Sequence, residues 1–255
     1  GQVFSAPTPD QMEAAANKVH NGKGILFIVK NYSGDIMNFE MGADMIDFDH
    51  ETILVNDDVA VEDSTFTTGR RGVAGTMIVE KTVGSLAETG ASLEECKLFG
   101  DHVNNVTASM GVAFTSCTVP AAGKPTFEIG AEEMEFGVGI HGEPGRKREK
   151  IKTANEITND IISTIIEDLK PNKNQEVLMH VNGFGGTPLM ELYLLFDVGQ
   201  KILEKEGINV SHSLVGNYTT SLDMAGASFS ITKLDEKITQ HWESAVHTAA
   251  LRWKI

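Results

Sequence analysis

Apolar runs of strand length alternate with amphipathic stretches of helix length in the first part of the chain. Residues 24–30 form an unbroken apolar run that the polar turn 31–35 closes. Runs of this kind are typical of strands buried on both faces of a parallel sheet. The elements predicted here are, in order, a helix over 11–20, a strand over 24–30, a helix over 36–45 and a strand over 52–55.

The middle of the chain predicts two helices and a strand, followed by a junction. The helical stretches are 72–88 and 92–109, and Ser92 and Glu95 have the spacing of a capping box. The short apolar run 111–114 predicts a strand. Because the next segment, 117–130, is rich in proline, glycine and threonine, we place a domain junction near it. The predicted domains are residues 1–115 and 116–255.

The second half repeats the alternation of strands and helices. The elements predicted for it are a strand over 135–140, a helix over 154–169, a strand over 176–181, a long helix from the loop 182–188 to residue 206, a strand over 209–215 and an apolar strand over 227–232. Alternation of this kind in both halves favours the α/β class. We therefore predict two α/β domains with mixed, largely parallel sheets flanked by helices.

Composition and charge narrow the range of functions. With 41% hydrophobic residues in 255, the chain has enough apolar surface to bury a core. The net charge of −15 argues against direct binding to nucleic acid or to anionic membranes, because such a surface repels phosphate groups. No apolar run approaches the roughly 18 residues of a membrane span. The two cysteines, Cys96 and Cys117, form neither a disulfide framework nor a metal-ligand set, which favours a reducing cytoplasm.

The turn after the first predicted strand carries two charged residues. Ligands of open α/β sheets gather beyond the carboxyl ends of strands, where Lys30 and Asp35 stand. Asp35 could act as a general base toward a hydroxyl group, and Lys30 could hold an oxygen or an anion. The alternative is structural: Asp35 caps a helix that begins at Ile36, and Lys30 is a solvated strand end.

His141 is the histidine with the most open surroundings. It lies in Ile-His-Gly-Glu-Pro-Gly at 140–145, whereas the other seven histidines fall in helix, strand or tail patterns. An imidazole is largely neutral at pH 7 and therefore nucleophilic, and Glu143 could orient the ring. The alternative is a turn histidine that bonds to a backbone carbonyl.

Two glycine-rich loops and one acidic segment give weaker signals. Backbone amides of 68–75 or 182–187 could hold a phosphate at a helix start, but neither loop has the Gly-Lys-Ser/Thr ending of a P-loop. No Gly-x-Gly-x-x-Gly opens a helix after the first strand. The acidic segment 56–63 lacks the spacing of a calcium loop, so we interpret it as a solvated loop or helix start. No set of residues has the spacing of a zinc site.

Seven blocks distributed over the whole chain carry a family resemblance. They include Lys-Asn-Tyr-Ser-Gly-Asp at 30–35 and Gly-Ile-His-Gly-Glu-Pro-Gly at 139–145. The full set is 29–40, 56–64, 69–75, 117–125, 139–145, 185–193 and 220–226. In sequence and in order, these blocks resemble the substrate-binding subunits of dihydroxyacetone kinases, the DhaK family.

The resemblance implies a covalent mode of substrate binding. His141 would add to the ketone carbon of dihydroxyacetone and hold it as a hemiaminal. Lys30 and Asp35 would bind the substrate hydroxyls, and Asp35 would help to deprotonate the one that is phosphorylated. Such a nucleophile separates dihydroxyacetone from glycerol chemically, whereas shape alone distinguishes near-isosteres by only about 1–3 kcal/mol.

The resemblance also implies partners. Without a P-loop, this chain is expected to carry no cofactor, and ADP with magnesium would be held by a separate kinase subunit. That subunit would receive phosphate from a phosphohistidine protein of the phosphoenolpyruvate-dependent phosphotransferase system. The family implies a homodimer. The alternative is a paralogue that binds dihydroxyacetone without catalysis and coactivates a transcription regulator.

The sequence departs from the family at its beginning. Family members have a Gly-Gly-Gly-Ser-Gly-His-Glu-Pro block that lines the substrate pocket and supplies a histidine for proton transfer. This block has no counterpart in the chain, which opens at Gly1-Gln2-Val3-Phe4. We expect the block to lie upstream of residue 1 and the first domain to lack its beginning.

Overall fold

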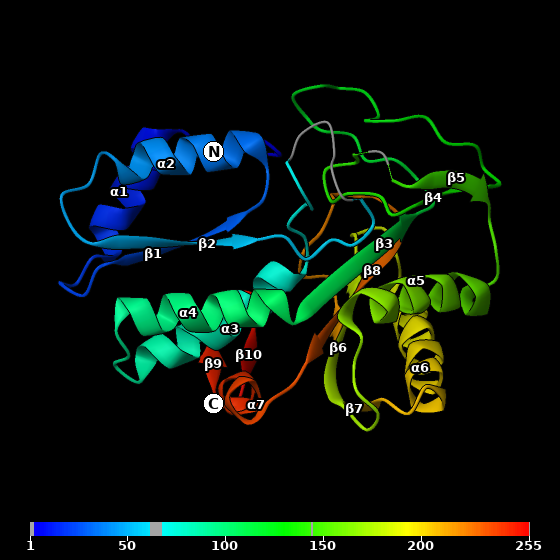
Figure 1. Cartoon of the computed structure of the whole chain (residues 1–255). Helices are drawn as coiled ribbons and strands as arrows, with labels where there is room; N and C mark the ends of the chain where they lie inside the picture. The colour runs from blue at the N-terminus through cyan, green and yellow to red at the C-terminus, as the bar shows by residue number, and fades with distance from the viewer. Residues whose placement is uncertain (1–2, 62–67, 144, 255) are drawn as a thin grey trace.

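The first part of the chain is a small parallel sheet between two helix pairs (Figure 1). The computed structural model describes residues 3–61, 68–143 and 145–254. The elements of this part are α1 (Pro9–Val19), β1 (Ile25–Lys30), α2 (Ser33–Ala43), β2 (His50–Val55), α3 (Gly75–Glu88) and α4 (Leu93–Asn105). β1 and β2 pair in parallel from Ile25 opposite His50 to Lys30 opposite Val55.

Both faces of this small sheet are covered. Phe27 and Val29 pack with Ala16 and Ala43 on the side of α1 and α2. Ile53 and the residues around it pack on the other side, against α3 and α4. Burial on two faces explains the unbroken apolar run of β1, whereas β2 is buried only at Ile53 and Val55 and exposes Leu54.

The second part of the chain is built on a six-stranded sheet with the order β5-β4-β3-β8-β6-β7. Its strands are β3 (Thr107–Ala113), β4 (Glu133–Phe136), β5 (Lys147–Lys150), β6 (Glu176–Gly183), β7 (Asn209–Gly216) and β8 (Gly226–Lys233). In this sheet β6 and β7 pair in parallel, and the other neighbours run antiparallel. The α/β class with mixed sheets flanked by helices is confirmed, while parallel pairing among the described strands is confined to β1–β2 and β6–β7.

Helices cover the six-stranded sheet on both faces. α5 (Ala154–Leu169) and α6 (Leu189–Lys205) pack on one face, around Met110, Met179 and Phe229. α3, α4 and α7 (Glu236–Glu243) pack on the other face, around Leu178. The α3–α4 pair therefore lies between the two sheets and contacts both of them (Figure 1).

Most predicted elements are present with shifted ends. α5 has the predicted bounds, with Thr153 and Glu156 in a capping box. α4 is shorter than predicted and stops at Asn105, because residues 107–113 are buried and pair with β8. The sequence patterns missed β5, α7 and the terminal hairpin of β9 (Val246–His247) and β10 (Arg252–Trp253).

The predicted domain boundary does not coincide with the division between the sheets. β3 lies before residue 115, yet it pairs with β4 and β8 in the six-stranded sheet. The division into residues 1–115 and 116–255 stays a prediction. None of the helices in the described ranges is both long and apolar enough to cross a membrane.

Candidate active site

A cavity of about 860 Å³ brings the three predicted site residues together. Lys30, Asp35 and His141 all line it. Lys30 ends β1, Asp35 lies in the first turn of α2, and His141 is on the loop that follows β4. The site is thus assembled from the carboxyl end of a strand, a helix start and a loop of the other half of the chain.

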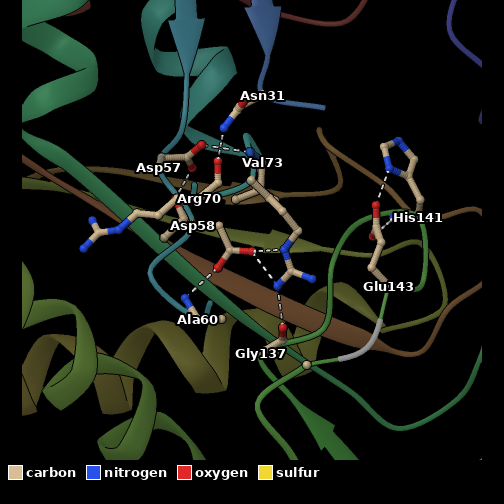
Figure 2. A network of polar contacts seen from close by, with 12 residues as sticks. Asn31, Asp57, Asp58, Ala60, Arg70, Val73, Gly137, His141 and Glu143 are labelled. Atoms are coloured by element: carbon tan, nitrogen blue, oxygen red, sulfur yellow. Dashed lines mark hydrogen bonds and ion pairs between the residues drawn. The ribbon is translucent and has the colours of Figure 1, made fainter. Parts of the chain in front are cut away.

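The His141 ring is held by a carboxylate. Its Nδ1 lies 2.8 Å from Glu143 Oε1, and the backbone N–H of His141 donates to Glu143 Oε2 at 2.9 Å (Figure 2). Because a carboxylate only accepts, Nδ1 carries a proton, and in the neutral ring the lone pair is on Nε2. No hydrogen bond to Nε2 is found within the described ranges, and the His141 side chain is 28% exposed. The geometry therefore presents a nucleophilic nitrogen.

Glu143 is buried but stays ionised. Its side chain is 7% exposed. Burial by itself would raise the pKa of this carboxyl, but the hydrogen bonds from the ring and backbone of His141 outweigh burial and lower the pKa. An anionic Glu143 fixes the tautomer of His141 and stabilises positive charge on the ring.

Two aromatic rings confine the His141 imidazole. Phe4 and Tyr32 contact it edge to face, with ring centroids at 4.9 and 4.8 Å. Tyr32 is buried, and its hydroxyl has no hydrogen-bond partner in the described part of the chain. Burial, followed by the charge of Glu143, raises the pKa of this phenol well above its ordinary value. Tyr32 is therefore neutral.

Asp35 is not a helix cap. α2 begins at Ser33 with Tyr32 as its N-cap, so the alternative of an Asp35 cap for a helix starting at Ile36 is wrong. Burial raises the pKa of Asp35, while His141 and Lys30 partly oppose the rise. No hydrogen bond of its carboxylate is found in the described ranges. A half-buried carboxylate of raised pKa facing a cavity is suited to general base catalysis.

Gly142 gives the His141 loop its shape. Its φ is +78°, and a Cβ at this position would collide with Thr126 Oγ1. Only glycine meets both requirements without strain. Steric constraints therefore require a glycine directly after His141, and its conformation determines the direction in which the chain leaves His141.

The first glycine-rich loop binds an internal carboxylate. The backbone amides of Val73 and Gly75 donate to Asp57 at 2.8 and 2.7 Å (Figure 2). Asp57 thereby occupies amides that the phosphate-loop interpretation would have offered to a ligand. Asp57 and Asp58 are only 2% and 1% exposed, so the interpretation of this acidic segment as a solvated loop is wrong for both. Glu62 and Asp63 lie outside the described residues.

The second glycine-rich loop packs against the segment before β8. The Gly186 amide donates to Met224 O at 2.9 Å, and the Phe184 amide donates to Gly226 O at 3.2 Å. Gly185 has a φ of +115°, and a Cβ there would collide with Leu222 O. These glycines allow two backbone segments to approach closely, which is a structural role.

A second cavity, of about 750 Å³, lies between α3, residues 218–219 and the C-terminal hairpin. Lys30 lines this cavity as well. Its histidine, His247, is exposed and has no carboxylate partner within the described ranges. We place the site in the His141 cavity, because there an oriented imidazole and a half-buried carboxylate meet.

The sequence patterns missed some residues that shape the site. Tyr32 stands two residues after a buried strand, between Lys30 and Asp35, and this position could have singled it out. Phe4 carries no comparable signal. Arg71 was considered only as part of a glycine-rich loop and of the family block 69–75, with no role of its own, although its side chain is fully buried.

The fold and the cavity define an α/β protein with an oriented imidazole, that of His141, in a cavity between its two halves. The model of the Dak1 domain family matches residues 1–250, and the chain belongs to this family. It is 49% identical over 254 residues to the dihydroxyacetone-binding subunit of a PTS-dependent dihydroxyacetone kinase from Listeria innocua, covering 98% of this chain and 77% of that protein.

Two further relatives agree with this family assignment. The dihydroxyacetone-binding subunit of the PEP-dependent kinase from Escherichia coli is 40% identical over 283 residues, covering 99% of this chain and 79% of that protein. Among solved structures, a dihydroxyacetone kinase operon co-activator matches with a TM-score of 0.88 and 31% identity, over 96% of this chain and 77% of that chain.

Proposed function

We propose that the chain is the dihydroxyacetone-binding subunit of a phosphoenolpyruvate-dependent dihydroxyacetone kinase. The observation that carries the proposal is the His141 imidazole, whose Nδ1 is bound by Glu143 while Nε2 is left for a ligand. Lys30 and Asp35 line the same cavity. The relatives from Listeria innocua and Escherichia coli are dihydroxyacetone-binding subunits, which supports this choice of substrate.

His141 would hold the substrate through a reversible covalent bond. The lone pair of Nε2 attacks the ketone carbon, and the π electrons of the carbonyl move to its oxygen. The proton on Nδ1 passes to Glu143, so the ring remains neutral, and the alkoxide takes a proton from solvent. The product is a hemiaminal with an N–C bond and a hydroxyl group.

This chemistry provides selectivity for ketones. Glycerol has no carbonyl carbon, so it cannot form the bond to Nε2. Contacts alone would distinguish the two compounds by only about 1–3 kcal/mol.

Asp35 would act in the transfer step that follows. Its carboxylate takes the proton of a terminal hydroxyl of the bound substrate, that oxygen forms a bond to the phosphorus of the donor, and the bond from phosphorus to the leaving oxygen of the donor breaks. Lys30, at the end of β1, places its positive charge near the Asp35 carboxylate and partly balances its negative charge. The donor would be supplied by a separate subunit that carries ADP and magnesium, itself phosphorylated through a phosphohistidine protein. Because the adduct fixes the attacking oxygen, positioning would supply much of the rate.

The test separates adduct formation from turnover. With dihydroxyacetone labelled with ¹³C at the carbonyl carbon, the unmodified chain is expected to shift that carbon signal from the ketone region to the sp³ region. His141→Ala should lose the shifted signal and turnover together. Asp35→Asn should keep the signal and lose formation of dihydroxyacetone phosphate when the partner proteins are added. A shifted signal that survives in His141→Ala would refute the assignment of the nucleophile.

A second candidate function is that of a non-catalytic co-activator that responds to dihydroxyacetone. The solved co-activator structure, with its TM-score of 0.88, favours keeping this candidate. Both candidates share the adduct, so turnover decides between them. An adduct without any product in the complete phosphotransfer mixture would favour the co-activator.

A further inference from the structure

A buried ion pair connects the loop before α3 to the loop that carries His141. Arg71 is fully buried; its Nε donates to Asp58 Oδ2 at 2.8 Å, and its Nη2 lies 2.7 Å from the same oxygen. The Nη2 group also donates to Gly137 O at 2.7 Å (Figure 2). Gly137 precedes His141 in the same loop, so the ion pair reaches the site through the backbone.

Stability alone does not explain this arrangement. Removing two charges from water is costly, and buried ion pairs are often no more stabilising than apolar residues of similar volume. Asp58 is held in place independently, because its Oδ1 accepts from the Ala60 amide at 2.9 Å. The pair is thus a rigid support that directs a guanidinium donor at the Gly137 carbonyl.

The loop from 137 to 143, the His141 loop, is anchored at its first residue and closed by an internal hydrogen bond. The Gly137 amide donates to Gly111 O of β3 at 2.7 Å, while Arg71 holds its carbonyl. The Gly139 amide donates to Glu143 O at 3.1 Å and closes the loop. Removing the guanidinium would release the Gly137 carbonyl from its side-chain donor.

The guanidinium of Arg71 also stands beside the carboxylate of Glu143. A Cβ built on Gly139 would lie 2.9 Å from Arg71 Nη1 and would collide with Glu143 Oε2. Both groups therefore crowd the same small space over Gly139. Because both groups lie close to this one point, the positive guanidinium favours the anionic carboxylate that binds His141 Nδ1.

We propose that Arg71, held by Asp58, is a positioning residue for His141: it fixes the His141 loop through Gly137 and stands beside Glu143, and so sets the direction of Nε2. This inference rests on the proposed function, because it concerns the approach of Nε2 to a ketone. Arg71 is not among the described residues that line the His141 cavity.

The test uses a double variant, Arg71→Met with Asp58→Asn. Arg71→Met alone would leave Asp58 buried without its partner and could unfold the chain. The double variant removes both charges together, so neither is left buried without its partner. The Asp58→Asn change also keeps a side-chain oxygen for the Ala60 amide, and we therefore expect the double variant to fold. We expect its thermal unfolding to resemble that of the unmodified chain. Its affinity for labelled dihydroxyacetone, titrated by the ¹³C adduct signal, should fall about 10- to 100-fold.

The tautomer of the His141 ring distinguishes a positioning role of Arg71 from a general loosening of the structure. The ¹⁵N signals of the His141 imidazole are expected to report a single Nδ1–H tautomer in the unmodified chain and a tautomer mixture in the double variant. An unchanged tautomer and an unchanged adduct affinity in a folded double variant would overturn the inference. Absence of any adduct with the unmodified chain would instead refute the proposed function.

The neighbouring arginine provides a matched control. Arg70 forms an ion pair with Asp168 in which both side chains are partly exposed, and it is in the same loop as Arg71. The double variant Arg70→Met with Asp168→Asn should keep the adduct affinity and the His141 tautomer of the unmodified chain. An equal loss of affinity in both double variants would contradict a specific role of Arg71.

Discussion

Tyr32 shows how a residue can support the site by its shape while its polar group has no partner. Its ring contacts the edge of His141, but its buried hydroxyl finds no acceptor among residues 3–61, 68–143 and 145–254. A buried hydroxyl without a partner loses its hydration and gains nothing in return. The role of Tyr32 should therefore lie in its ring.

Tyr32→Phe tests this division of roles. Because the ring contact is retained and an unpaired hydroxyl is removed, we expect the free energy of unfolding to stay equal or to rise by up to about 1 kcal/mol. The affinity for dihydroxyacetone, measured by the adduct signal, should not change. Tyr32→Ala, which removes the ring, should destabilise the chain by about 3 kcal/mol and weaken the adduct. Loss of the adduct in Tyr32→Phe would show that the hydroxyl takes part in the chemistry.

At the scale of elements, helices and strands are predicted best from the sequence where local interactions determine their ends. The capping box of Ser92 and Glu95 is present at the start of α4, as predicted. The start of α2 was placed too late because its N-cap, Tyr32, makes no capping hydrogen bond through its side chain. β5, with the sequence Lys-Arg-Glu-Lys, was missed because a polar edge strand depends on its neighbour β4 and not on its own pattern.

The same limit applies to the site. Lys30 ends a strand, Asp35 lies in the first turn of a helix and His141 is in a loop, all positions where exposure can be anticipated, and the structure brings them to one cavity. Arg71 and Asp58 belong to segments whose composition resembles that of solvated loops. Their burial follows from β3 and the His141 loop closing over them, so it is a tertiary effect that no local pattern reports.

The His141 loop offers a prediction that compares two glycines. Gly142 and Gly123 both have positive φ, at +78° and +63°, but a Cβ on Gly142 would collide with Thr126 whereas Gly123 has open space. Gly123→Ala should lower the free energy of unfolding only by the backbone strain, about 1 kcal/mol. Gly142→Ala should lower it by about 2 kcal/mol more, because Thr126 or the loop has to move.

Urea unfolding and the adduct titration measure the two effects. We expect Gly142→Ala to weaken the adduct together with stability, and Gly123→Ala to leave the adduct unchanged. Equal losses of stability in the two variants would mean that Thr126 yields freely and that the loop is not sterically fixed.

At the scale of the whole molecule, the α3–α4 layer couples the two sheets. The segment that leads into α3 carries Arg71, and the amide of Gly75, the first residue of α3, binds Asp57. Asp57 in turn accepts from Ser109 of β3, at a distance of 2.5 Å. A chain of buried polar contacts thus runs from the small sheet to the six-stranded sheet. The geometry at His141 consequently depends on the packing of both halves.

His180 makes the stability of the whole chain depend on pH. It lies in β6 and is fully buried; its Nδ1 donates to Leu214 O at 3.0 Å, and its Nε2 has no partner in the described part of the chain. Burial lowers its pKa to about 4, although the bond to Leu214 opposes the shift. An unfolded histidine takes up its proton near pH 6.5, so between pH 6.5 and about 4 the unfolded state binds more protons and stability falls with falling pH.

His180→Leu should remove this part of the pH dependence. Between pH 7 and pH 4.5 we expect the unmodified chain to lose more unfolding free energy than the variant, by on the order of 2–3 kcal/mol. Urea unfolding at both pH values measures the difference. Carboxyl groups with shifted pKa values, such as Glu143, are present in both proteins and cancel in the comparison. His247→Leu changes an exposed histidine and should follow the unmodified chain. Parallel losses in His180→Leu and the unmodified chain would show that His180 is protonated in the folded state.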